Sequence, residues 1–73
     1  MVAQIELSDD EIDRVFHALA DATRRDILRR TSAAEFSVSQ ISDDYNMSFA
    51  AVQTHVAVLE AAGLIIKRAE GRE

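Results

Sequence analysis

The chain has 73 residues, which is long enough for one small domain. Its residues are 48% hydrophobic and 29% charged, a composition typical of globular rather than disordered proteins. Acidic residues outnumber basic ones by 13 to 8, and the net charge of −5 by itself disfavours nucleic acid as a partner. The absence of cysteine excludes disulfides, thiolate metal sites and cysteine nucleophiles. Because the sequence has neither a membrane-spanning apolar stretch nor a signal-peptide pattern, we predict a cytoplasmic protein without a membrane partner.

The first predicted helix begins at Ser8. Ser8 and Glu11 have the spacing of a capping box, in which each side chain accepts a hydrogen bond from the backbone amide of the other. The acidic residues between them are favourable at the positive end of the helix dipole. Further along, apolar residues recur at i, i+3, i+4 and i+7 and predict a single apolar stripe: Ile12, Val15, Phe16 and Leu19.

The second predicted helix starts near Asp21 and turns Ile27 and Leu28 towards the core. Its other faces are rich in arginine, and three interpretations of these side chains remain open at this point. They could form a solvated face, contact phosphates or form ion pairs. The side chains concerned are Arg24, Arg25, Arg29 and Arg30.

A second capping box at residues 37–40 predicts a third, short helix, and Asn46 suits the turn that follows it because Asn tolerates left-handed backbone. Ser48 is the predicted cap of a fourth helix from about Phe49 to Ala61, which Gly63 ends. A short helix, a three-residue turn and a longer helix over about residues 37–62 have the spacing of a helix-turn-helix.

Residues 64–68 predict a β-strand, and Gly71 and Arg72 predict the turn of a hairpin whose second strand is missing. Residues 64–73 are therefore predicted to start a wing. The predicted fold is mainly α: a single winged helix-turn-helix domain over residues 1–73, with about four helices and a short β-strand of an incomplete wing.

Projection of the fourth helix at about 100° per residue places Val52, Val56 and Leu59 on one arc, which must face the core. The opposite arc has only small or neutral side chains, Ala50, Thr54, Ala57 and Ala61, with Gln53 on its flank. Such a face favours close approach to another surface, in which Gln53 and Thr54 would hydrogen-bond to base edges in the major groove. The alternative is that the alanines simply favour helix.

The sequence resembles a known family in several stretches. FHALADATRRDIL at residues 16–28 resembles the opening signature of the arsenic-repressor (ArsR/SmtB) family of bacterial winged-helix regulators, with Ala22 where proline is frequent. Residues 37–41 and 47–65 resemble the rest of the pattern, and the resemblance covers about residues 12–72. It implies a homodimeric repressor that binds a palindromic operator near its own promoter and releases it on a signal.

The resemblance and the projection together assign residues to this function. Base reading is predicted for Phe49, Ala50, Gln53 and Thr54. Phosphate contacts are predicted for Ser48, Lys67, Arg68, Arg72, Arg24 and Arg25. The dimer interface is predicted to use Ile5, Leu7, Ile12 and Phe16.

The sequence also departs from the family pattern. Metal-sensing members carry Glu-Leu-Cys-Val-Cys, whereas residues 35–39 here are Glu-Phe-Ser-Val-Ser, and serine hydroxyls are poor ligands for soft metals. The second wing strand and the family's C-terminal helix are missing, so we expect a truncated form with a weakened dimer. His17 and His55 have no second ligand at a metal-site spacing, and a structural hydrogen bond is the simpler role for His55. We predict neither metal nor cofactor.

The sequence also bears on two other classes of function. No nucleophile elbow, phosphate loop, metal-protease motif or dinucleotide fingerprint is present, so an enzyme is not predicted. The stronger alternative is a winged-helix module that binds protein without DNA specificity. The negative net charge favours it, as do Ala57, where many family members have a basic residue, and the aromatic Phe49, where a polar residue is common.

Overall fold

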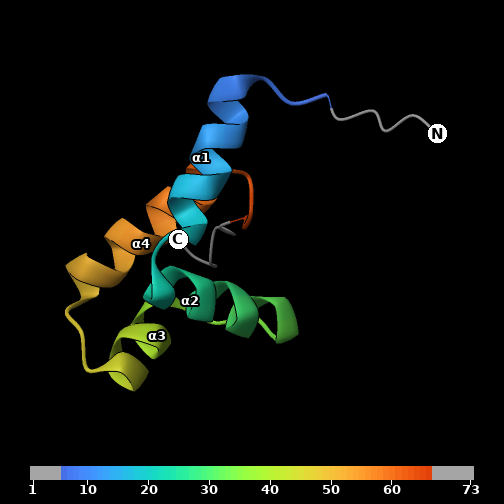
Figure 1. Ribbon diagram of the computed structural model, residues 1–73. Coiled ribbons are helices and arrows are strands. Elements are labelled where there is room, and N and C mark those ends of the chain that lie inside the picture. The colour runs from blue at the N-terminus through green and yellow to red at the C-terminus, as the bar shows by residue number, and fades with distance from the viewer. Residues whose placement is uncertain (1–5, 67–73) are drawn as a thin grey trace, which may run out of the picture.

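The computed structural model describes residues 6–66, which form four helices: α1 (Asp9–Leu19), α2 (Ala22–Ala33), α3 (Val38–Tyr45) and α4 (Phe49–Ala61). The last helix, α4, packs against all three others, while α1 and α3 lie towards its opposite ends (Figure 1). The prediction of a mainly α fold with about four helices is confirmed for this part of the chain.

All four helices begin at the residues that the sequence predicts. Ser8 forms a capping box with Glu11, and Ser37 forms one with Gln40. In each box the serine Oγ accepts from the backbone amide of the partner at 3.1 Å. The Glu11 and Gln40 side chains accept in return from the serine backbone amides, at 2.8 and 2.7 Å. The other two helices are capped by Asp21 and Ser48. Each cap satisfies an amide that the helix itself leaves unpaired, so these starts are encoded locally.

The helices α3 and α4 end in the same way. Asn46 after α3 has φ 55° and Gly63 after α4 has φ 76°, so both predicted turn residues adopt the left-handed conformation. In both cases a following amide donates to a carbonyl of the last helical turn, at 3.2 Å after α3 and 3.0 Å after α4. A Cβ on Gly63 would meet nothing within 4 Å, so backbone conformation rather than crowding favours glycine there.

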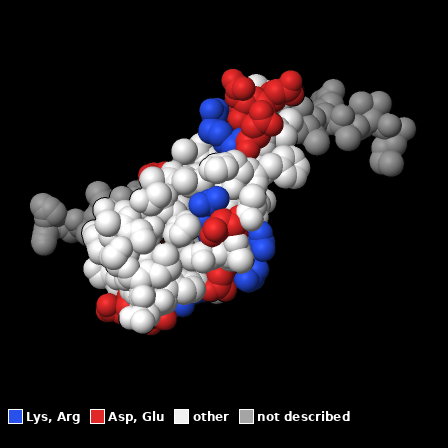
Figure 2. All heavy atoms as spheres, turned by 60° about the vertical axis from the view of Figure 1, so that its left-hand side comes forward, with Lys and Arg blue, Asp and Glu red and all other residues white. Residues whose placement is uncertain are grey.

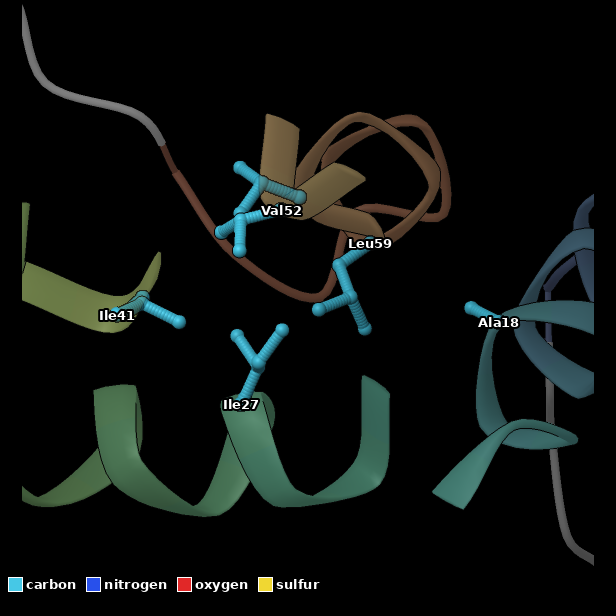
Figure 3. Packing of buried hydrophobic residues seen from close by; sticks show 6 residues of the cluster. Ala18, Ile27, Ile41, Val52 and Leu59 are labelled. Carbon is cyan, nitrogen blue, oxygen red and sulfur yellow. The ribbon is translucent and has the colours of Figure 1, made fainter. Parts of the chain in front are cut away.

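The core lies where α4 meets the other helices. Three of its buried side chains, Val52, Val56 and Leu59, come from α4 and confirm the arc predicted to face inward. The other helices each contribute one, so that Ile27 of α2 and Ile41 of α3 point towards α4, with Ala18 of α1 at the side (Figure 3). The six side chains fix which face of α4 is covered and which is left to the outside.

The apolar stripe predicted on α1 is only partly directed inward. The buried residue of this helix is Ala18, and Phe16 is 69% exposed. Ala18 and Phe16 lie on opposite sides of Val15 and Leu19, both half-buried, when the helix is projected at about 100° per residue. The side of α1 that faces the core is therefore centred closer to Ala18 than the predicted stripe is. Phe16 lies at the edge of that stripe farthest from the core.

The strand predicted at residues 64–68 is not formed in its described part. Residues 64–66 have no strand pairing; Leu64 and Ile65 pack against the core, while Ile66 is 89% exposed. A strand requires a partner to supply the ladder of hydrogen bonds, and the described residues offer none. The remainder of the predicted wing, including its turn at Gly71 and Arg72, lies outside the described residues.

Candidate nucleic-acid interface

The helices α3 and α4 form a helix-turn-helix, with residues 46–48 as the turn between them. The left-handed Asn46 ends the first helix, and the Ser48 side chain accepts from the Ala51 amide at 3.0 Å to start the second. Because the Ser48 oxygen acts as an acceptor in this cap, its O–H remains able to donate outward.

The outward side of α4 consists of short or uncharged residues. We call it the α4 face and define it as Phe49, Ala50, Gln53, Thr54 and Ala57, all of which are exposed. No Asp, Glu, Lys or Arg occurs between Asn46 and Leu59. Figure 2, in which the side of the molecule bearing the α3–α4 turn comes forward, shows a broad uncharged area between acidic groups at the top and the bottom.

The polar groups of the α4 face differ in what they can still bind. The Thr54 hydroxyl donates to the Ala50 carbonyl at 3.0 Å, so its proton is used within the helix and only its lone pairs and methyl group face outward. The Gln53 amide makes no hydrogen bond to any described residue, which leaves both its donor and its acceptor available. Gln53 is thus the side chain of this face best able to form a two-point hydrogen bond.

Arg24 has a structural role that the sequence did not specify. Its Nε donates to the Ala18 carbonyl at 2.9 Å, one Nη donates to the His17 carbonyl at 3.0 Å, and the other lies 3.2 Å from His55 Nδ1. Arg25 similarly donates to the Leu19 carbonyl at 2.6 Å. Arg24 and Arg25, which are both predicted to contact phosphates, therefore also hold the end of α1, where helix carbonyls have no partner within the helix.

Ion pairing, one of the open interpretations of the arginines, is found for the other two. Arg29 pairs with Asp26 at 3.3 Å within α2. Arg30 pairs with Asp44 of α3 and lies 4.8 Å from the Phe36 ring centroid and 5.4 Å from that of Tyr45. The carboxylate of Asp44 raises the pKa of Arg30 further above its ordinary value.

A second contact between α2 and α3 joins Tyr45 to Asp26, whose carboxylate accepts a hydrogen bond from the phenol. That hydrogen bond lowers the pKa of Asp26, while burial raises the pKa of Tyr45. These two contacts orient α3 and with it the turn that leads into α4. These two contacts could not be predicted from the sequence, because neither pair of residues has a recognisable spacing along the chain.

His55, on the inner edge of α4, is held by α2. Its Nδ1 lies 3.2 Å from Arg24 and 3.9 Å from the Asp21 carboxylate, so the structural hydrogen bond predicted for this histidine is confirmed. Within residues 6–66, no group of three or more His, Cys, Asp or Glu side chains is placed to hold a metal ion.

The residues predicted for the dimer lie at the surface where they are described. Leu7 is 47% exposed and Phe16 is 69% exposed, whereas Ile12 is half-buried. Other predicted site residues lie outside the described part of the chain: Ile5, Lys67, Arg68 and Arg72.

The fold and the exposed second helix define a class of protein. The model of the helix-turn-helix domain family matches residues 19–68, and the chain belongs to this family. It is also 39% identical over 59 residues to the HTH-type transcriptional regulator Rv2034 of Mycobacterium tuberculosis. The matched region is 81% of this chain and 55% of that relative, so the chain spans about half of the relative's length. Within the described residues no helix is long and apolar enough to cross a membrane.

Proposed function

We propose that this chain is a sequence-specific DNA-binding transcriptional regulator, a homodimeric repressor of the arsenic-repressor type that acts on a palindromic operator in the cytoplasm. One observation carries the proposal: the second helix of a helix-turn-helix is held by three buried side chains so that an uncharged, short-chained face is left exposed. A helix presented in this way fits the major groove. The related transcriptional regulator supports the same class of function.

In this proposal the base contacts come from Phe49, Ala50, Gln53 and Thr54, at the N-terminal end of α4. The N-terminal residues of a recognition helix are the ones that reach base edges. Phosphates are contacted by Ser48, Lys67, Arg68 and Arg72, with Arg24 and Arg25 as further candidates. Arg25 is the better placed of those two, because it is exposed whereas Arg24 is half-buried.

The homodimer would form through α1 and the residues before it. Exposed Leu7 and Phe16 supply apolar surface on the described part of this region, with Ile12 beside them and Ile5 preceding them in the sequence. We expect this dimer to be weak. Sedimentation should show mainly monomer at low micromolar concentration, and a tight dimer there would contradict the expected weakness.

The regulator is proposed to lack both catalysis and metal sensing through thiolates. Its serines at positions 37 and 39 take the places where metal-sensing relatives carry cysteines, and Ser37 is already used as the cap of α3. A hydroxyl engaged in a helix cap is a poor ligand for a soft metal.

The proposal is tested by fluorescence anisotropy of the chain on DNA from upstream of its own gene and on a scrambled duplex. We expect tighter binding to the upstream DNA and a loss of affinity when the salt concentration is raised, because phosphate contacts release counterions. Equal binding to the two duplexes would contradict sequence-specific recognition.

A second candidate function is a winged-helix module that binds protein. The net charge of −5 favours it, as does Phe49, an aromatic side chain 48% exposed at the start of α4. Aromatic residues are common anchors of protein interfaces. This candidate predicts no preference between the two duplexes and a loss of partner binding on Phe49→Ser.

A further inference from the structure

The α4 face is unusually rich in apolar groups for a surface proposed to lie in a DNA groove. Three of them lie in the first two turns of the helix: the Phe49 ring, the Ala50 methyl group next to it in the chain, and the Thr54 methyl group one turn after Ala50. Phe49 is 48% exposed and the other two are also exposed. The Thr54 hydroxyl already donates to the Ala50 carbonyl at 3.0 Å, which turns a nominally polar side chain into one whose outward contact is largely a methyl group.

The major groove offers one apolar group on its base edges, the C5 methyl of thymine, and Ala, the Thr methyl group and Phe are the side chains that contact it. The described part of α4 lacks the groups that select the other pairs. Guanine is read by Arg or Lys and cytosine by Asp or Glu, and none of these occurs between Asn46 and Leu59. The one free amide, Gln53, suits adenine.

We infer that the α4 face selects A·T base pairs in each half-site, and that it does so mainly through the thymine methyl groups rather than through hydrogen bonds. Phe49, Ala50 and Thr54 form the apolar surface that receives these methyl groups. Gln53, between Ala50 and Thr54 along the helix, binds an adjacent adenine. This inference rests on the proposed function, since it assumes that α4 enters the major groove.

Removal of the methyl groups alone tests the inference. A duplex is first enriched with this chain from a random DNA library, and each of its thymines is then replaced in turn by deoxyuridine, which keeps every hydrogen bond of the base pair and lacks only the methyl group. Anisotropy should show binding weakened about fourfold at each contacted thymine, the effect of one buried methyl group. Thymines outside the half-sites should show no change.

Two substitutions at one position assign the effect to the protein. Thr54→Ser keeps the hydroxyl and removes the methyl group, so it should reduce the thymine-over-deoxyuridine preference at one position about fourfold. Thr54→Val keeps the methyl group and replaces the hydroxyl with a second methyl group, so it should retain that preference. Ser32→Ala, an exposed serine of α2, is the control, and thermal melting checks that each variant is folded.

The possible outcomes separate this inference from the function on which it rests. If an enriched duplex binds equally well with thymine and with deoxyuridine, or if Thr54→Val loses the preference while Thr54→Ser keeps it, the methyl-reading inference is wrong and specific DNA binding stands. If the chain enriches no duplex from the library, the proposed function itself is contradicted, and the inference fails with it.

Discussion

Arg24 joins three helices through one planar side chain. From α2 it donates to two carbonyls at the end of α1 and contacts His55 of α4, while its backbone amide donates to the Asp21 cap at 3.0 Å. The guanidinium group can serve these partners at once because its N–H donors diverge in a fixed plane, which a lysine ammonium cannot reproduce. The position of α4 relative to α1 and α2 therefore depends on an arginine at this site.

We predict that Arg24→Lys lowers the free energy of unfolding by about 1–3 kcal/mol, since it removes hydrogen bonds from a charged donor to the carbonyls at the end of α1. Urea denaturation measures this change. Arg29→Lys is the matched control on the same helix, because the Arg29 side chain is 70% exposed and makes one pair within α2, so it should change stability by less than about 0.5 kcal/mol. If the free energy of unfolding falls equally in the two variants, the Arg24 contacts contribute no more stability than the exposed Arg29 ion pair.

At the scale of elements, the turn between α3 and α4 sets the direction in which α4 leaves the motif. Its geometry depends on Asn46, the one described non-glycine residue with a positive φ. The Met47 amide donates to the Ser42 carbonyl across this turn at 3.2 Å. Left-handed backbone is costly for residues with a Cβ, and Asn tolerates it better than most.

Asn46→Ala should therefore destabilise the domain by about 1 kcal/mol, and Asn46→Gly should be neutral or slightly stabilising at the same position. In a domain of this size, a loss of about 1 kcal/mol lowers the melting temperature by roughly 4–8 °C. Thermal unfolding followed by circular dichroism distinguishes the two variants. A stable Asn46→Ala protein would mean that the turn tolerates a different backbone conformation.

The same elements show what sequence can and cannot predict. The starts of the helices, the left-handed turn residues and the inner arc of α4 are encoded by residues within one or two turns of each other, and all were predicted. The exposure of Phe16 and the contacts of Arg30 with α3 were not, because they depend on how separate helices cross. The exposed face of α4 was predictable because it is the complement of the buried arc. The hydrogen bond from the Thr54 hydroxyl to the Ala50 carbonyl was not predicted.

At the scale of the whole molecule, part of the acidity serves the fold. Hydrogen bonds from Ser8 lower the pKa of Glu11, the Arg24 amide lowers that of Asp21, and the Tyr45 phenol lowers that of Asp26. These carboxylates cap helices or join α2 to α3. Much of the negative charge thus lies at helix starts and contacts between helices, while the α4 face remains uncharged.

These three shifts predict that acid destabilises the domain. A carboxyl whose pKa is lower in the folded state stabilises it fully above the ordinary pKa values of 3.8 and 4.5, and this contribution is lost as the pH falls through the lower folded-state values. The urea midpoint should thus be lower at about pH 3 than at about pH 7. Asp21→Asn keeps a residue able to cap α2 and removes the titrating group, so it should lessen this drop. An unchanged drop would show that Asp21 does not contribute to it.

The central claim, that the α4 face reads DNA bases, is tested most directly by the double substitution Gln53→Ala and Thr54→Ala. Both side chains are exposed, so the fold should survive, as thermal melting with Ser32→Ala as a control can verify. Anisotropy on DNA from upstream of the gene and on the scrambled duplex should then show a reduced preference for the upstream DNA, because two of the four proposed base-contacting side chains have been truncated. If the double variant still prefers the upstream DNA as strongly as the parent chain does, bases are not read by this face and the account is wrong.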